Sequence, residues 1–334
     1  MASDDYSYLP NKVSQLEPKR DWRRSVDKLT VTNEQVEEIS DSQPLWCDSI
    51  FHQKSHVWVA PPNGGKTTIA TSAAAELAND GYEVLYFNLD AGAADLKHYQ
   101  GLAESSGYRL IAPLEAGTSE ADCISVITQM LEDDDLSDCV VFLDTLKKFT
   151  DVISKQNSKK FYANVRGLTI RGCTVIALAH TNKHPDSDGK LVYEGTGDLK
   201  ADFDIMMMLY PSKTDTELTV STEFEKERAL VKPQTFVIDS SRSVTLSGDY
   251  TNTRELEHVR RQEANDSEVI DFIKDLISLK PMNQSGVIAA CKDAGMGNRK
   301  PTMRVLRAYR NRHWTCERGF QNNELRYISL DHSP

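Results

Sequence analysis

Several features that mark other classes of protein are missing from this 334-residue sequence. Its six cysteines form no C-x-x-C pair, so their spacing indicates neither a zinc site nor a disulfide framework. No run of 18 apolar residues predicts a membrane span, and the polar opening MASDDYSYLPNKV has no apolar segment typical of a secretory signal. Since Cys139 and Cys173 lie within apolar runs, we expect reduced thiols in a cytoplasmic protein that has no membrane partner.

A general excess of positive charge is also missing, because the formal net charge is −11. This excludes a protein that coats nucleic acid with its whole surface, while 39% hydrophobic and 27% charged residues suit a soluble globular chain. The charge is unevenly distributed. Residues 266–334 contain 11 Lys and Arg against 8 Asp and Glu, a net of +3, which leaves −14 for the remainder. A local basic surface is therefore expected near the C-terminus.

The clearest motif is VWVAPPNGGKTT, residues 57–68, which nearly matches the phosphate-binding pattern G-x-x-x-x-G-K-[ST]. Ala60 stands at the first glycine position, where alanine is acceptable unless φ is positive. An apolar strand precedes the motif, and apolar residues at helical spacing follow it, so free N–H groups and the helix dipole would face an anion. We therefore expect ATP and Mg²⁺ as cofactors. The predicted ATP-binding residues are Asn63, Gly64, Gly65, Lys66, Thr67 and Thr68.

Strand and helix patterns alternate from about residue 56 to residue 247. Continuous apolar strands are expected at 83–89, 139–144 and 173–180, and helices near 96–105 and 119–132. The segments DIMMMLYP, TELTVSTEF, TFVID and SVTLSG follow with only loops between them, which indicates hairpin pairing. The fold class is therefore α/β, with a mainly parallel sheet covered on both faces.

Three polar residues are expected at the carboxyl ends of these strands. Asp144 ends VVFLD in the manner of a Walker B strand, so Asp144 and the Thr67 hydroxyl are the predicted Mg²⁺ residues. Asp90 ends the strand after the phosphate-loop helix, and two roles remain open: orienting the attacking water or capping the helix near residues 91–95. His180 either senses the terminal phosphate or is an exposed residue at the end of its strand.

The last part of the chain has a separate pattern. Residues 250–266 are highly charged and predict a linker, followed by helices at 268–279, 283–294 and 301–311 and a hairpin in ERGFQNNELRYISL. Three helices and a hairpin are typical of a winged helix. The predicted divisions are residues 1–50, an N-terminal extension; 51–249, the ATPase domain; 250–266, the linker; and 267–334, the winged-helix domain.

The run from residue 298 to residue 314 is basic and contains no acidic residue. Met303, Leu306 and, one turn on, Tyr309 or the stem of Arg310 are expected to face the core. Arg304 and Arg307 are expected to share an exposed face, as in a recognition helix. Docking of a protein on this surface is the alternative. The candidate nucleic-acid contacts are Arg299, Lys300, Arg304, Arg307 and Arg310.

NGGKTT, the carboxylate after YFNL, FLDTLKKF and ALAHTNK together resemble the RecA-like ATPases. The resemblance covers about residues 45–245 and is strongest to the hexameric RepA-type branch of the DnaB-like helicases, through FLDTLKKF. It implies that Lys226 and Arg228 in FEKERALVKPQTFVID act as fingers on a neighbouring subunit's nucleotide. The alternative is two charges on one face of an exposed strand. It also implies a DNA-contacting loop within residues 181–202, with Lys183, Lys190 and Lys200 as candidates.

These observations predict an ATP-hydrolysing, hexameric motor or loader of DNA replication that acts on single-stranded DNA. The predicted catalytic set is Lys66, Asp90, Asp144, His180, Lys226 and Arg228. One alternative is an ATP-switched DNA-binding regulator that does not unwind DNA. For the motor, replication proteins are expected partners besides single-stranded DNA. A third interpretation is a RecA-like ATPase whose partners are proteins only.

Overall fold

The computed structural model describes residues 26–27, 29–33, 43–90, 92–151, 155–182, 191–193, 198–318 and 325–330. Residues 44–334 form one compact unit, separate from residues 1–43. The basic stretch PKRDWRR, residues 18–24, lies outside the described residues.

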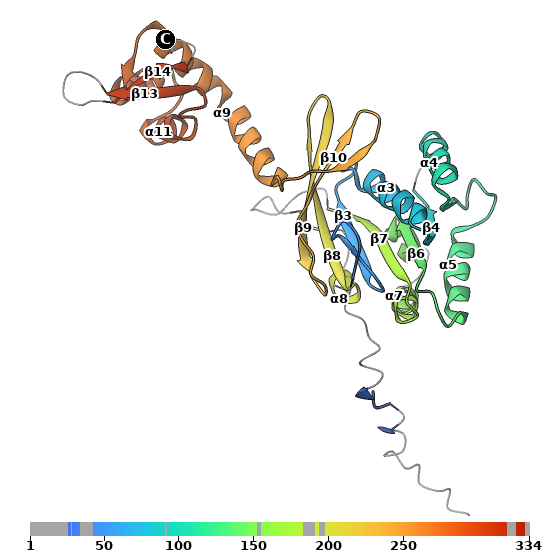
Figure 1. The fold of residues 1–334 in the computed structure, drawn as a ribbon. Coiled ribbons are helices and arrows are strands. Elements are labelled where there is room, and N and C mark those ends of the chain that lie inside the picture. Colours follow the sequence, from blue (N-terminus) through green and yellow to red (C-terminus); the bar gives the residue numbers. More distant parts are fainter. Residues whose placement is uncertain are drawn as a thin grey trace, which may run out of the picture. The chain divides into compact units, whose positions relative to one another are not determined.

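A nine-stranded sheet forms the centre of the first part of this unit (Figure 1). Its strand order is β11-β10-β9-β8-β3-β7-β6-β4-β5. The strands from β8 to β5 in this order are parallel, and β8 to β11 pair as successive antiparallel neighbours. The mainly parallel sheet and its hairpin extension are both confirmed. The strands are β3 (Ser55–Ala60), β4 (Glu83–Asn88), β5 (Arg109–Ile111), β6 (Cys139–Asp144), β7 (Thr174–His180), β8 (Ile205–Lys213), β9 (Glu217–Lys226), β10 (Thr235–Asp239) and β11 (Val244–Leu246).

Helices cover both faces of the sheet, because the central strands are apolar on each side. One core contains the alanine-rich face of α3 and Ala103 of α4, and the other contains side chains of α5, α6 and α7. The Met206–Met208 run is buried in β8. The helices are α3 (Lys66–Asn79), α4 (Ala93–Ser106), α5 (Glu120–Gln129), the 3₁₀ turn η1 (Met130–Glu132), α6 (Leu146–Asp151), α7 (Lys155–Ile170) and α8 (Asp198–Asp202).

The predicted start of the ATPase domain at residue 51 is too late. The short strands β1 (Pro44–Trp46) and β2 (Ile50–Phe51) pair with each other, and Trp46 and Ile50 are buried in the core beside Trp58. These apolar side chains remove their surface from water only by packing on the sheet, so the domain includes residues 44–50. Helix α7 was not predicted, although Phe161, Val165 and Leu168 have the spacing of a buried helical face.

The predicted linker at residues 250–266 is mostly helical. Thr253–Leu279 is one helix of 27 residues, α9, and the charged stretch forms its first half. Asn252 caps the helix by accepting a hydrogen bond from the Glu255 N–H, and Arg260 pairs with Glu257 one turn away. The first turn is also anchored to the sheet, where the buried Thr253 hydroxyl bonds to Ser221 and to the Tyr210 carbonyl. The charged side chains of this segment thus lie on a helix, where ion pairs such as Arg260–Glu257 form between neighbouring turns.

The second half of α9 belongs to a small C-terminal assembly. This assembly also contains β12 (Met282–Asn283), α10 (Gln284–Asp293), α11 (Arg299–Ala308), β13 (Trp314–Arg318) and β14 (Leu325–Ser329). Its three strands pair in the order β12-β14-β13. Its core gathers apolar side chains from all three helices around the fully buried Trp314.

The apolar face of α11 differs from the expected one. Leu306 and Tyr309 are buried as predicted, but Val305 takes the place expected for Met303, which is only partly buried. Arg304 lies over this core edge, where its guanidinium forms two hydrogen bonds with Asp266 of α9. Asp266 also accepts a 2.9 Å hydrogen bond from the Tyr309 hydroxyl. One carboxylate thus fastens α11 to α9.

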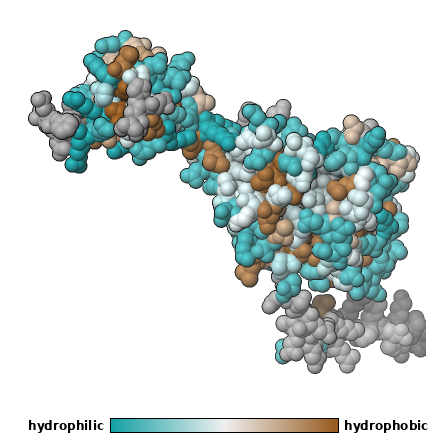
Figure 2. All heavy atoms as spheres, turned by 45° about the horizontal axis from the view of Figure 1, so that its top comes forward, coloured by the Kyte–Doolittle hydropathy of each residue, from teal (hydrophilic) through white to brown (hydrophobic). Residues whose placement is uncertain are grey.

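Within the described ranges, none of the helices combines the length and the apolar character needed to cross a membrane. Figure 2 shows hydrophilic residues over much of the visible face, with smaller apolar groups among them.

We predict that Asp266→Asn lowers the free energy of unfolding of the C-terminal assembly by about 1–2 kcal/mol, because its charge-assisted hydrogen bonds weaken. Arg304, first, and Tyr309 lower the pKa of Asp266 against the opposing effect of burial. The stabilisation is therefore present above the unfolded-chain pKa of about 3.9 and is lost as the pH falls through the lower folded value. Denaturant titration followed by Trp314 fluorescence measures it. Asp271→Asn, an exposed site on the same helix, is the control, and equal loss in both variants would contradict the assignment.

Candidate nucleotide-binding site

The phosphate loop lies between the carboxyl end of β3 and the start of α3. Asn63 has φ 58° and Gly65 has φ 81°, and Gly65 is the residue that precedes the first turn of α3. A Cβ on Gly65 would lie 2.7 Å from Ile238 Cδ1, and one on Gly64 would lie 2.9 Å from the Pro61 carbonyl oxygen. The two glycines are therefore required by close packing as well as by the positive φ at Gly65.

 
Ala60 is the last residue of β3, pairs in register with His180 of β7, and is fully buried. Its backbone is that of an extended strand, a conformation that alanine adopts as readily as glycine does. The replacement of the first glycine is therefore compatible with a working phosphate loop, as the sequence indicated.

Asp144 is the centre of the site. Its carboxylate accepts a 2.8 Å hydrogen bond from the Thr67 hydroxyl and a 3.0 Å hydrogen bond from the Tyr86 hydroxyl. Lys66 Nζ lies 4.0 Å from the other carboxylate oxygen, and both charged side chains are almost completely buried. The structure thus brings together the lysine, the threonine and the aspartate that the sequence selected.

Burial controls the protonation of this pair. It raises the pKa of Asp144, against the opposing effects of Lys66, Thr67 and Tyr86, and it lowers the pKa of Lys66 against the pull of Asp144 and Asp90. Each charge would be favoured by an oppositely charged ligand brought into the site.

Tyr86 was not predicted as a site residue. It lies on β4, where Asn88 is the register partner of Asp144, so Tyr86 and Asp144 share a face two positions apart. Burial, first, and then Asp144 raise the pKa of Tyr86 well above its ordinary value, so Tyr86 acts as a hydrogen-bond donor. The available signal was a hydroxyl within the otherwise apolar run VLYF.

The residues present fit a nucleotide and Mg²⁺. The Thr67 hydroxyl and the Asp144 carboxylate supply the oxygen ligands that Mg²⁺ prefers, and Lys66 supplies a cation for the outer phosphates. The glycines leave the backbone free to approach an anion at the start of α3. No cluster of three or more His, Cys, Asp or Glu that could hold a metal occurs among the described residues, so an ion here would depend on phosphate oxygens for further ligands.

Asp90 and His180 lie beside this centre. Asp90 Oδ2 is 3.6 Å from His180 Nε2, and Asp90 is half-exposed. Gly92 precedes the first turn of α4 and no side chain caps it, so the alternative role of Asp90 as that helix cap is wrong. Burial, first, and then Lys66 lower the pKa of His180, which favours a neutral imidazole. His180 Nδ1 is buried without a hydrogen-bond partner among the described residues.

Residues 57–203 match the family model of the ATPase family associated with various cellular activities (AAA). The match runs from β3 to beyond α8 and includes the phosphate loop, Asp144 and His180. This segment is a P-loop ATPase domain. The match supports ATP hydrolysis, for which such domains typically use Mg²⁺.

Among solved structures, the chain is similar to the flagellar accessory protein FlaH from Methanocaldococcus jannaschii, with a TM-score of 0.44 and 13% sequence identity. The similarity covers 59% of this chain and 91% of that one. No curated protein matches the chain. The RepA-type branch therefore stays a prediction.

Lys226 and Arg228 lie far from their own phosphate loop. Arg228 pairs with Asp204 at 3.1 Å, and Asp204 accepts hydrogen bonds from Ser55, the first residue of β3. Lys226 Nζ donates to the carbonyl oxygens of Lys200 and Ala201 in α8. The phosphate loop follows the last residue of β3, so one strand length, roughly 17 Å, separates the two ends.

The candidate DNA-contacting loop is described only in part. Lys183 and Lys190 lie outside the described residues, and Lys200 Nζ lies 3.3 Å from Glu225. This ion pair offsets the positive charge of Lys200.

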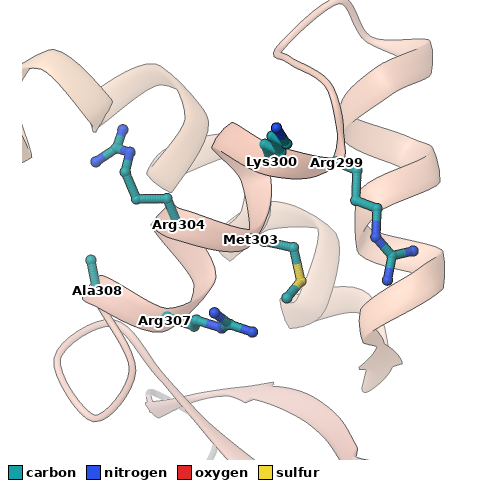
Figure 3. Close-up of a pocket in the computed structure, with 6 residues that line it drawn as sticks. All are labelled: Arg299, Lys300, Met303, Arg304, Arg307 and Ala308. Carbon is teal, nitrogen blue, oxygen red and sulfur yellow. The ribbon is translucent and has the colours of Figure 1, made fainter.

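The basic residues of α11 divide into two groups. Figure 3 shows Arg304 pointing away from the side on which Arg299, Met303 and Arg307 lie, at successive intervals of four residues. Arg304 serves the contact with Asp266, so its predicted role as a free nucleic-acid contact needs correction. A surface pocket of about 740 Å³ is lined by Arg299, Lys300, Met303, Arg304, Arg307 and Ala308. Arg310 is exposed just beyond the helix.

We predict that Lys66→Ala lowers ATP turnover about 10²-fold or more, because the site loses its buried cation. The fold should persist, since Asp144 keeps its hydrogen bonds from Thr67 and Tyr86. Phosphate release and thermal unfolding measure the two effects. Lys97→Ala, an exposed site on α4, is the control, and wild-type ATP affinity and turnover in folded Lys66→Ala protein would refute the assignment.

Proposed function

We propose that this chain is a subunit of an ATP-driven, ring-forming motor or loader of DNA replication. ATP and Mg²⁺ occupy the site around Lys66, Thr67 and Asp144. A neighbouring subunit supplies Lys226 and Arg228 to the terminal phosphate. The C-terminal assembly is a winged helix that binds DNA.

The observation that carries this proposal is the separation of Arg228 from its own phosphate loop. In Figure 1, α8 lies at the lower end of β8 and β9, whereas α3 lies beside their upper part. The start of β9 touches the phosphate loop, because Leu218 and Val220 lie next to Gly65, and the end of β9 carries Lys226. Arg228 can therefore reach a nucleotide only on another copy. Head-to-tail contacts of this kind close into rings when the rotation permits it.

Two features support DNA as the partner. His180 ends β7 beside the nucleotide site, and the predicted DNA-contacting loop follows it directly in the sequence. A change at the nucleotide would therefore be felt at the start of that loop. The face of α11 with Arg299, Met303 and Arg307 combines positive charge with an apolar side chain. Among the described residues, neither arginine of this face has an acidic partner. Such a face suits the phosphates and base edges of a DNA groove.

An ATP-switched DNA-binding regulator is the second candidate. The contact between Asp90 and His180 favours it, because nucleotide binding alone could rearrange this pair at the start of the loop. Unwinding of a forked duplex separates the candidates: the motor separates the strands, and the regulator binds the fork and leaves it paired.

The direct test of the proposed function is ATP turnover with and without single-stranded DNA, together with mass in solution in the presence of ATP. The proposal expects stimulation by DNA and a ring-sized mass. An ATPase that is indifferent to DNA would favour a role with protein partners only.

We predict that Arg228→Ala preserves ATP binding and lowers turnover, because arginine fingers contribute roughly 10³–10⁵ in rate in well-studied phosphoryl-transfer systems. Mixing Arg228→Ala with Lys66→Ala subunits should restore part of the activity, since some sites then pair an intact loop with an intact finger. Arg109→Ala, another exposed and ion-paired arginine on the sheet, is the control. Near-normal turnover in Arg228→Ala, without any gain on mixing, would eliminate the trans-acting site.

We also predict that replacing Arg299 and Arg307 with Ala weakens duplex DNA binding by the full-length chain and makes it less dependent on salt. Each lost phosphate contact reduces the salt slope by about one. Fluorescence anisotropy at two salt concentrations measures both changes. Replacing Arg261 and Lys280, two exposed basic residues of α9 and its end, removes the same charge and serves as the control. Equal loss in both double variants would favour a nonspecific charge effect.

A further inference from the structure

We propose that Arg166, on α7, is a third member of the cationic group that contacts the terminal phosphate of a nucleotide held by a second copy of the chain. This inference rests on the proposed function, in which Lys226 and Arg228 act on a neighbouring site. It adds a residue from helix α7, whereas Lys226 ends β9 and Arg228 follows that strand. No sequence motif indicated this residue.

The geometry centres on Asp204, whose two carboxylate oxygens have different partners. Oδ2 accepts hydrogen bonds from the backbone N–H and the hydroxyl of Ser55, at 3.1 and 2.9 Å. Oδ1 faces Arg228 at 3.1 Å and Arg166 at 3.4 Å. One half of the carboxylate is thus fixed to β3, and the other half holds two guanidinium groups together.

The burial of these groups differs sharply. The Asp204 side chain is 5% exposed, while those of Arg166 and Arg228 are 57% and 55% exposed. Asp204 is the ion-pair partner of both arginines among the described residues, and each contact uses only one Nη1 atom. A guanidinium carries five N–H donors, so both arginines retain donors toward solvent.

The group has more positive than negative charge. Asp204 offsets one of the two arginines, and Lys226 is held by the neutral carbonyl groups of Lys200 and Ala201. Burial, first, and then the neighbouring Arg228 lower the pKa of Lys226, against the pull of Asp204. Like charges held together on a fixed support are suited to an anion from outside, and planar guanidinium groups suit phosphate oxygens.

The position of the three cations indicates that the anion belongs to a second copy and not to the chain's own nucleotide. Asp204 lies at the amino end of β3, and the chain's own phosphate loop lies at the opposite end. In a head-to-tail assembly, different surfaces of two copies meet, so this group can face a neighbour's nucleotide. In hydrolysis, water attacks the terminal phosphorus and the bond to the ADP oxygen breaks. The arginines form no covalent bond and stabilise the negative charge on the departing phosphoryl group.

The experiment measures ATP turnover, ATP affinity and thermal unfolding of full-length Arg166→Ala, with Lys160→Ala on the same helix as the exposed control. We expect at least a tenfold loss of turnover with unchanged ATP affinity. Arg166→Gln, which keeps a donor for Asp204, should lose turnover without any loss of thermal stability. Normal turnover in Arg166→Gln would overturn the proposal and leave Arg166 as a structural partner of Asp204.

Mixing experiments separate this inference from the proposed function. Arg166→Ala should regain activity when mixed with Lys66→Ala subunits. It should gain none with Arg228→Ala subunits, because Arg166 and Arg228 lie on the same surface and every site would still lack one of the two arginines. If turnover is lost in Arg228→Ala but normal in Arg166→Ala, only the role of Arg166 is overturned. Normal turnover in both variants would overturn the trans-acting site itself. Loss of single-stranded DNA affinity, with DNA-free turnover unchanged, would assign the group to DNA phosphates and overturn the proposal.

Discussion

The buried carboxylate of Asp144 is the constraint on which the nucleotide site depends. It ends a central strand and is reached by Lys66 and Thr67 from α3 and by Tyr86 from β4. A buried charge is costly unless it is paired and hydrogen-bonded, so these partners must be held close to it. The parallel sheet achieves this by aligning the carboxyl ends of β3, β4, β6 and β7 at one edge.

The opposite edge of the same sheet has its own buried carboxylate, Asp204. There the partners are Ser55, Arg166 and Arg228, and the arginines remain half-exposed. The end of the sheet with Asp144 is thus suited to bind the phosphates of the chain's own nucleotide. At the end with Asp204, the half-exposed Arg166 and Arg228 can contact a second molecule. The length of β3 separates the two, which is why the proposed catalytic unit consists of two copies.

Local patterns made the nucleotide site predictable. Gly64, Gly65, Lys66 and Thr67 lie within a single loop and the helix that follows it, and the apolar strand ending in Asp144 indicated its place at the same edge. Tyr86 escaped prediction because its role depends on register between β4 and β6. The sheet order from β11 to β5 could not be derived from strand patterns alone, although the hairpins at its end could.

Long-range pairing explains the remaining differences. Arg304 fits a recognition helix by its spacing, but Asp266, 38 positions earlier in the chain, takes its guanidinium. Arg166 lies in a helix that was not predicted, and its partner Asp204 is also 38 positions away. The charged stretch at 250–266 resembles a linker by composition, yet its first turn is bonded to the sheet through Thr253.

In the proposed assembly, hydrolysis requires two copies of the chain. Turnover per subunit, measured over protein concentrations from far below to far above assembly at saturating ATP, tests it most directly. We expect negligible turnover at the lowest concentrations and a rise to a plateau that coincides with the increase in mass. Constant turnover per subunit across the range, with the protein still monomeric, would contradict it.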